Sequence, residues 1–329
     1  MTWLADALAS LPAGDADAAA AVRARADDIL RPAGALARLD EVAVFMAAWQ
    51  GTERPAVRRP AGLIFAADHG VAAAGDVSAY PVAVTAAMMA AFRAERSTVS
   101  AFAAVAGATV DAIDVGVGRP TNDFRFEAAL SPGRFDDAVA AGRTAVESLD
   151  ADLLVLGEMG IGNTTAAAAI SAALDRDSVD GWVGRGTGVD DEGLARKRAA
   201  VAAAVARIDG ITDPLEILRE VGGAELVAIA AAIVAARHRN LPVLLDGFVV
   251  TAAAAPLAAV RPDALDHCLV GHCSAEPGHL RLLDRLGKQP LLTLDMRLGE
   301  GSGAMAAVPL VAMACAGVTS VPTFGEWFG

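Results

Sequence analysis

The chain has 329 residues and a formal net charge of −13, which fits one large domain or two and argues against a nucleic-acid partner, because nucleic-acid binding favours a basic face. No run of about eighteen uninterrupted apolar residues predicts a membrane span, and an N-terminus with early acids and no basic segment is not typical of a signal peptide. The three cysteines fit reduced thiols, so we expect a cytoplasmic protein.

The first 58 residues are predicted to be helical. Residues 16–30 are rich in alanine and arginine, and residues 36–49 place apolar side chains at roughly helical spacing. Arg31-Pro32-Ala33-Gly34 interrupts the pattern between them. A charged segment with prolines, residues 53–60, then marks a domain boundary.

From residue 61 the chain alternates between short apolar segments and alanine-rich helical stretches. The predicted strands are residues 62–67, 109–115, 153–156, 242–245, 268–270 and 291–294. This order favours an α/β fold, with a Rossmann-like parallel sheet and helices on both of its faces. After residue 309 we expect a helix and then an aromatic tail.

Polar and glycine residues follow every predicted strand. The ends of parallel strands meet at one edge of a sheet, where open α/β folds bind ligands. The segments expected to gather there are Asp68-His69-Gly70, Gly116-Val117-Gly118, Gly157-Glu158-Met159-Gly160, Asp246-Gly247, and residues 271–279 and 297–303.

The glycine-rich stretch 157–165 is predicted to be a turn between a buried strand and a helix that opens on Asn163 or Thr164, both good N-caps. Such a turn directs backbone N–H groups and the positive end of the helix at one spot, which suits a phosphate. Glu158 lies in the same turn. A carboxylate there makes sense if the ligand also carries a cation or a proton to be moved.

Two known glycine motifs and an ordinary turn are alternatives for this stretch. Asn163 replaces the lysine of the P-loop, which argues for a monophosphate rather than a triphosphate. The order of the glycines differs from the dinucleotide-binding fingerprint. A second glycine-rich loop, residues 184–188, precedes Asp190 and then Lys197 on the next predicted helix.

Taken together, the chain resembles the nicotinate-nucleotide–dimethylbenzimidazole phosphoribosyltransferases over nearly its whole length. The motifs that carry the resemblance are Ala67-Asp68-His69-Gly70-Val71, Val77-Ser78-Ala79-Tyr80-Pro81, residues 157–165, Gly184-Arg185-Gly186-Thr187-Gly188 with Asp190-Asp191, residues 272–279, and residues 296–304. The resemblance implies a large α/β domain of residues 59–304 and a small helical domain of residues 1–58 and 305–329. It also implies a homodimer that needs no metal and no organic cofactor.

The same resemblance implies transfer of the phosphoribosyl group of nicotinate mononucleotide to dimethylbenzimidazole, in assembly of the cobalamin lower ligand. Glu300 is the implied general base. Glu158 is the second candidate catalytic residue. The nucleotide and its phosphate are assigned to Gly160, Gly162, Asn163, Thr164, Gly186, Gly188, Asp190, Lys197, Ser274 and Gly278. The acceptor base is assigned to Ser78, Tyr80, Met159, Leu298 and Met305.

The chemistry of the residue types agrees with these roles. A benzimidazole nitrogen must lose its proton as its partner nitrogen attacks, and a carboxylate in an apolar pocket is a suitable base, because burial raises its pKa. Leu298 and Met305 are expected to form that pocket. The leaving pyridinium is already cationic and needs no acid, while Glu158 is placed to stabilise the oxocarbenium-like sugar.

Some features depart from the family pattern or leave alternatives open. Ala86-Ala87-Met88 stands where a glutamine is expected near the base, and residues 95–98 replace a glycine–alanine segment, so a different acceptor base is an alternative. Another kind of nucleotide-binding enzyme and a non-catalytic binding protein are further alternatives. A zinc site among the histidines and cysteines of residues 267–279 is not favoured, because their spacing lacks the usual close ligand pairs.

Overall fold

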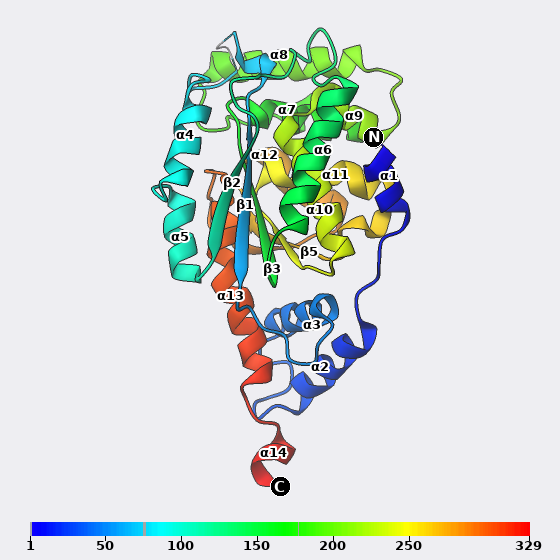
Figure 1. Cartoon of the computed structure of the whole chain (residues 1–329), viewed down its shortest axis with the longest axis vertical. Coiled ribbons are helices and arrows are strands. Elements are labelled where there is room, and N and C mark those ends of the chain that lie inside the picture. The colour runs from blue at the N-terminus through cyan, green and yellow to red at the C-terminus, as the bar shows by residue number, and fades with distance from the viewer. Residues whose placement is uncertain (1, 75–76, 177) are drawn as a thin grey trace.

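The computed structural model describes residues 2–74, 77–176 and 178–329 and is organised around one parallel sheet (Figure 1). Its strands are β1 (Pro60–Ala67), β2 (Thr109–Gly116), β3 (Leu153–Met159), β4 (Val243–Leu245), β5 (Cys268–Cys273) and β6 (Pro290–Thr293). They are hydrogen-bonded in the order β2-β1-β3-β4-β5-β6, and every pair is parallel. The predicted α/β fold is confirmed.

Helices cover both faces of this sheet. Their bounds are α1 (Thr2–Ala9), α2 (Ala16–Asp28), α3 (Arg38–Gln50), α4 (Val84–Arg93), α5 (Thr98–Ala106), α6 (Pro132–Glu147), α7 (Asn163–Asp175), α8 (Asp191–Arg207), α9 (Pro214–Val221), α10 (Ala224–His238), α11 (Phe248–Val260), α12 (Pro277–Leu286), α13 (Ser302–Thr319) and α14 (Phe324–Phe328). Helices α4, α5 and α13 lie on one face, and α6, α10 and α11 lie on the other (Figure 1).

Small side chains let the layers pack closely. Strands β1 and β3 are buried along their whole length, as expected for the continuous apolar runs of a parallel sheet. Helix α10 is buried on nearly all sides, beneath α6. A Cβ at Gly142 of α6 would lie only 2.0 Å from the carbonyl oxygen of Ala228, so this helix crossing requires a glycine.

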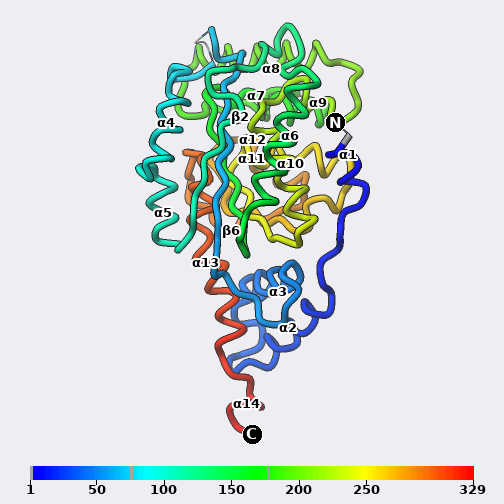
Figure 2. The backbone as a smooth tube through the Cα atoms, in the orientation of Figure 1, coloured from blue at the N-terminus to red at the C-terminus, as the bar shows by residue number. Residues whose placement is uncertain are grey.

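A second, smaller core forms at the narrow end of the molecule from both ends of the chain. It consists of Val22, Ala26, Ile29, Ala43, Val44, Ala47 and Val318. Figure 2 shows the blue α2 and α3 beside the red end of α13. Helix α1 packs against α10 instead, within the main core. The domain bounds 1–58 with 305–329, and 59–304, stay a prediction.

Helix α13 connects the two cores. By length and hydropathy it is, within the described residues, the one helix that meets the criteria for a membrane span. However, 56% of it is buried, and it packs against β5, α5 and α3. This burial is typical of a core helix, and it agrees with the predicted absence of a membrane span in this segment.

The structure corrects the predicted turn after β3. The strand extends to Met159, so Glu158 is a strand residue and does not belong to the turn. Gly162 is the N-cap of α7, with φ at +96°, a conformation that favours glycine. Asn163 is therefore the first residue of the helix, and its side-chain amide donates to the carboxylate of Glu158. The prediction of Asn163 or Thr164 as the N-cap was wrong.

Candidate active site

A cavity lies at the carboxyl ends of β3, β4, β5 and β6, at the edge where the sequence predicted a ligand site. It is lined by Glu158, Met159, Gly160, Ile161, Asn163, Thr164, Gly186, Thr187, Gly247, Phe248, Val249, His272, Ser274, Glu276, Arg297, Leu298, Gly299 and Glu300. Its volume is about 90 Å³. Pockets that enclose drug-sized ligands have about 300–1,000 Å³, so a ligand of that size would extend beyond this cavity.

Glu300 is held in an uncommon backbone conformation between β6 and α13. Residues Gly299, Glu300 and Gly301 have φ values of +83°, +64° and +77°. Such a conformation at a residue with a side chain costs about 1–3 kcal/mol and persists only where the surroundings fix it. A Cβ at Gly157 of β3 would lie 2.6 Å from the amide nitrogen of Gly301, so a glycine in the neighbouring strand is required for this approach.

The carboxyl group of Glu300 is suited to accept a proton near neutral pH. The residue is only 6% exposed. Burial, and then the nearby charge of Asp246, raise its pKa to about 7. A general base works best when its pKa is close to the pH at which it acts.

Glu158 lies against the same loop from β3. A Cβ at Gly299 would fall 2.5 Å from Oε1 of Glu158, while the amide of Asn163 donates to Oε2. Burial raises the pKa of Glu158 well above its usual value, and the charges of Asp246, Glu225 and Glu300 add to this effect. The two glutamates therefore face one space from adjacent segments.

Three other buried acids near the cavity each have a basic neighbour. Oε1 of Glu225 lies 2.5 Å from Nε2 of His69, and Oδ1 of Asp246 lies 3.4 Å from Nε2 of His272.

Glu276 interacts electrostatically with Lys197. Within the described part of the chain, neither Glu158 nor Glu300 has a basic side chain at salt-bridge distance. The raised pKa values favour the neutral forms of these two carboxyl groups in the free site, and a positively charged ligand would favour their ionised forms.

Lys197 lies behind the turn that was predicted to hold a phosphate. Its ammonium donates to Oγ1 of Thr164 at 2.8 Å, and a Cβ at Gly186 would lie 3.2 Å from Nζ. Burial lowers the pKa of Lys197 to about 8, against the opposing effect of Glu276. Thr164, Gly186 and Lys197 thus form one polar cluster beside the cavity.

The cavity brings together about half of the predicted site residues. Those that line it are Glu158, Met159, Gly160, Asn163, Thr164, Gly186, Ser274, Leu298 and Glu300. Those placed outside its lining are Ser78, Tyr80, Gly162, Gly188, Asp190, Lys197, Gly278 and Met305.

Several of the residues outside the lining have structural contacts of their own. Asp190 caps α8 by accepting from the amide of Gly193 at 2.8 Å. A Cβ at Gly278 would lie 2.9 Å from the ring of Phe248. Met305 is fully buried, and its Cε lies 3.1 Å from where a Cβ of Gly62 would stand, so it packs under β1. The expected apolar wall of Leu298 and Met305 is provided by Leu298 and Phe248.

Of the predicted base-binding residues of the loop before α4, Tyr80 is exposed and Ser78 is half-buried. Tyr80 is 51% exposed, and its amide donates to Oγ of Ser78 at 3.2 Å. They do not extend the apolar wall of the cavity in this conformation.

The sequence reasoning did not single out some of the residues that line the cavity. They are Ile161, Thr187, Gly247, Phe248, Val249, His272, Glu276, Arg297 and Gly299. Most of them lie in the segments that follow the predicted strands. Their position directly after a predicted strand indicated that they lie at the carboxyl edge of the sheet. It did not indicate which of their side chains point into the cavity.

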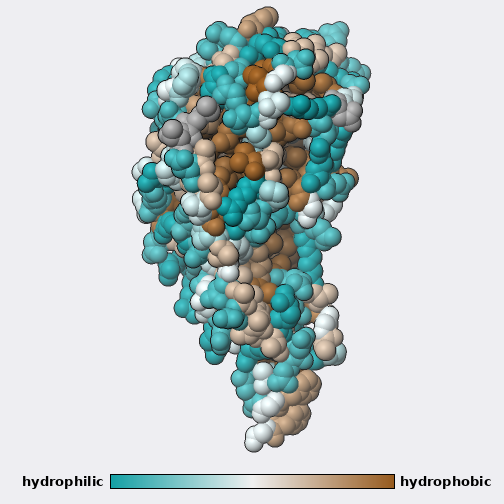
Figure 3. All heavy atoms as spheres, turned by 90° about the vertical axis from the view of Figure 1, so that its right-hand side faces the viewer, coloured by the Kyte–Doolittle hydropathy of each residue, from teal (hydrophilic) through white to brown (hydrophobic). Residues whose placement is uncertain are grey.

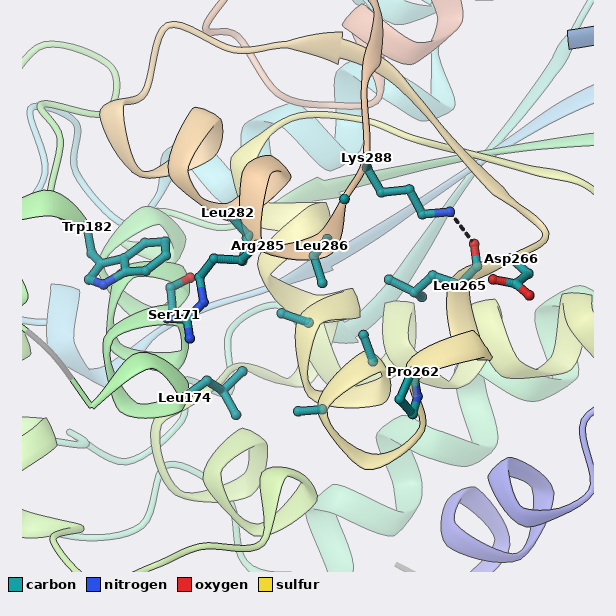
Figure 4. A pocket seen from close by; sticks show the side chains of 14 residues that line it. Ser171, Leu174, Trp182, Pro262, Leu265, Asp266, Leu282, Arg285, Leu286 and Lys288 are labelled. Atoms are coloured by element: carbon teal, nitrogen blue, oxygen red, sulfur yellow. Dashed lines mark hydrogen bonds between the residues drawn. The ribbon is translucent and has the colours of Figure 1, made fainter. Parts of the chain in front are cut away.

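A larger cavity, of about 490 Å³, lies away from this edge, between α7, α11 and α12 (Figure 4). Its basic groups are already engaged. Arg285 pairs with Asp175, and Lys288 donates to the carbonyl oxygens of Leu265 at 2.7 Å and Cys268 at 3.0 Å. It therefore offers less for chemistry than the cavity with two unpaired acids.

The histidine, cysteine and acidic side chains were candidates for metal ligands. Among the residues that the structure describes, no group of three or more histidine, cysteine, aspartate or glutamate side chains is arranged to hold a metal ion. Burial raises the pKa of Cys268 to about 12, which keeps this cysteine a thiol.

The buried acids and the glycine turn lie at the carboxyl edge of an open parallel sheet, where α/β proteins bind their ligands. A family model described as phosphoribosyltransferase matches residues 11–327. The chain belongs to this phosphoribosyltransferase family, and it is a transferase of the pentosyltransferase class.

Individual relatives are similar over nearly the full length. A nicotinate-nucleotide–dimethylbenzimidazole phosphoribosyltransferase from Novosphingobium aromaticivorans is 50% identical over 321 residues, which cover 97% of this chain and 94% of that protein. A protein of the same name from a Ruegeria species is 49% identical, with 99% and 97% covered. The crystal structure of CobT from Thermus thermophilus matches with a TM-score of 0.90 and 44% identity, over 94% of this chain and 98% of that one. The resemblance inferred from the motifs is confirmed.

Proposed function

We propose that the chain transfers the phosphoribosyl group of nicotinate mononucleotide to 5,6-dimethylbenzimidazole or a related base. The products are α-ribazole 5′-phosphate and nicotinate, and the reaction contributes the lower ligand of cobalamin. The observation that carries the proposal is the pair of buried acids without a basic partner, Glu158 and Glu300, at one cavity with the glycine turn, which Lys197 contacts from behind at Thr164. The names of the relatives support the choice of substrates.

Glu300 is the general base in this proposal. One ring nitrogen of the benzimidazole attacks C1 of the ribose and forms the new N–C bond. The N–C bond to the pyridinium breaks, and its electron pair returns to the ring nitrogen of nicotinate. The proton of the second benzimidazole nitrogen passes to the carboxylate of Glu300, whose pKa of about 7 suits this transfer.

Glu158 stabilises the positive charge of the nucleotide in the same step. The pyridinium is cationic before transfer, and the sugar carries oxocarbenium-like charge as the bond breaks. The bound cation favours the ionised form of Glu158, which no basic side chain of the described segments neutralises, and the carboxylate then stabilises the developing charge strongly because the surroundings hold little water. The phosphate is assigned to the turn at Gly160–Thr164 with Gly186 and Lys197, and no metal or organic cofactor is invoked.

A different acceptor base is the alternative, and one observation favours it. Ala87, which stands at the position where a polar residue was expected, is exposed and offers only a methyl group. An acceptor pocket that works by stacking and shape discriminates a missing methyl by only about 1–3 kcal/mol. We therefore propose that other benzimidazoles are also accepted.

We further propose that the chain acts as a cytoplasmic homodimer. The aromatic tail supports a second copy as partner, because Phe324, Trp327 and Phe328 are 43%, 63% and 74% exposed at the narrow end. Apolar surface also gathers in the middle of the wide body on the face seen in Figure 3. Sedimentation analysis at several protein concentrations tests this assembly.

The decisive experiment mixes the purified chain with nicotinate mononucleotide and a panel of bases, with and without a chelator, and measures released nicotinate. We expect release that depends on a benzimidazole and is unchanged by the chelator. Absence of nicotinate with every base would reject the proposal. Loss of activity with chelator and recovery with zinc would reject the metal-free mechanism alone.

A further inference from the structure

The loop that carries Glu300 leads directly into α13, whose first turn lacks a side-chain cap of its own. The first amides of a helix have no partner within the helix. The N-cap of α13 is Gly301, which has no side chain to accept them. Whatever satisfies these amides also fixes the residue before them, which is Glu300.

Asp246, which follows β4, accepts hydrogen bonds from this turn. Its Oδ2 accepts from the amide of Gly301 at 3.2 Å, and its Oδ1 accepts from the amide of Ala304 at 2.8 Å. A carboxylate is favourable at this end of a helix, because the helix dipole is positive there. Asp246 is buried and does not line the cavity.

We propose that Asp246 is a positioning residue for the transfer, which holds Glu300 at the cavity through the backbone amides of Gly301 and Ala304. The proposal rests on the role of Glu300 in the proposed function. It assigns Asp246 no contact with substrate, because its two oxygens already serve the loop and the helix.

His272 braces Asp246 from β5. Its Nε2 lies 3.4 Å from Oδ1 of Asp246, and neither ring nitrogen has a hydrogen-bond partner among the residues described. A Cβ at Gly303 would fall 2.0 Å from the ring, so the imidazole lies directly against the first turn of α13. The ring thereby restricts the positions open to both the carboxylate and the turn.

The charge of Asp246 should affect the pH dependence of activity, which a purely structural residue would not change. Asp246 is the second cause, after burial, of the raised pKa of Glu300. Other titratable groups that line the same cavity are Glu158 of β3, His272 of β5, Glu276 before α12 and Arg297 of the loop. Neutralising Asp246 therefore lowers the pKa of Glu300 and shifts the acid limb of activity to lower pH.

The test uses Asp246→Asn in the full-length chain, with Asp213→Asn as matched control. Asp213 caps α9 by accepting from the amide of Leu215 at 2.9 Å, away from the cavity. In Asp246→Asn we expect turnover to fall by up to about 100-fold, because a misplacement of about 1 Å at a reacting group can cost this factor. The Michaelis constant for the nucleotide should change little, and the acid limb should move down in pH. Asp213→Asn should change neither quantity.

Hydrogen exchange provides a readout that does not depend on activity. In the wild-type protein the amides of Gly301 and Ala304 should be protected, and in Asp246→Asn the segment 299–305 should exchange at least tenfold faster. If the wild type releases no nicotinate, the proposed function fails, while exchange still decides whether Asp246 holds the loop.

Two outcomes would overturn the inference: unprotected amides at Gly301 and Ala304 in the wild type, or a variant whose exchange and acid limb both match the wild type. Should Asp246→Asn not fold, Asp246→Ser keeps one acceptor without the charge, and the wild-type exchange measurement stands by itself.

Discussion

Replacing Glu300 by glutamine should separate activity from stability. Glutamine keeps the shape and can adopt the same backbone conformation, but it cannot accept a proton. General-base assistance is worth about 10²–10⁴-fold in rate, so turnover should fall by that factor while nucleotide affinity stays nearly unchanged. The wild-type rate should rise tenfold per pH unit up to about pH 7 and then level off, because the base must be ionised, and the variant should lack this limb.

The stability of the same variant should change in the opposite direction. The pKa of Glu300 is about 7 in the folded protein and 4.5 in ordinary surroundings, so the unfolded chain loses this proton first. The folded state is therefore progressively destabilised as the pH rises from about 4.5 to 7. One pKa unit corresponds to about 1.4 kcal/mol, which gives about 3 kcal/mol, and roughly half of that after allowance for screening by water in the cavity. Above pH 7, Glu300→Gln should be more stable than the wild type by this amount.

Turnover, nucleotide affinity and urea unfolding at several pH values test both expectations. Glu95→Gln is a matched control, because Glu95 is also a glutamate with positive φ, at +56°, but it is exposed. It should leave turnover and the pH dependence of unfolding unchanged. Near wild-type turnover in Glu300→Gln would remove Glu300 from the mechanism and move the base role to Glu158. Equal unfolding curves at high pH would show that the carboxyl group is not destabilised by burial.

Three other predictions concern Lys197, Gly157 and the choice of acceptor base. Lys197→Ala should raise the Michaelis constant of the nucleotide more than it lowers turnover. In the wild type, nucleotide affinity should fall above about pH 8, where Lys197 loses its proton, and the variant should lack this fall. An unchanged Michaelis constant with a large fall in turnover would contradict this. Gly157→Ala should displace the amide of Gly301, lower the unfolding free energy by about 1–3 kcal/mol and reduce turnover. The control is Gly133→Ala, which should not destabilise the protein because its Cβ would meet nothing within 4 Å. Competition assays should show use of several benzimidazoles, and rejection of all but one by more than a thousandfold would refute relaxed base choice.

The parallel sheet could be predicted because its signal is local. Each strand is a short apolar run between glycine or polar residues, and the alternation with helices implies parallel order. The ends of strands were less predictable, since tertiary contacts decide them. β3 continues through Gly157 to Met159 because these residues pair with Ile64–Ala66 of β1, a contact between residues far apart in the chain.

The edge that bears the site could also be predicted, but the direction of each side chain could not. Met305 was expected in the apolar wall, yet the rotation of α13 directs it under β1. Asn163 has the composition of an N-cap, yet its amide is taken by Glu158 and the cap is Gly162. The direction of these side chains depends on tertiary contacts, which the local sequence does not specify.

The pairing of charges distinguishes Glu158 and Glu300 from three other buried acids near the cavity. His69 and Glu225 are 156 positions apart in sequence, and Asp246 meets His272 across adjacent strands, so neither pair can be derived from spacing along the chain. Glu158 and Glu300 lack such a partner in the described segments, and burial, followed by the charge of Asp246, raises the pKa of both. A bound cationic nucleotide would supply the positive charge that these two acids lack. The cost of ionising the acids in the free site and the proposed preference of the site for this substrate therefore have the same physical origin.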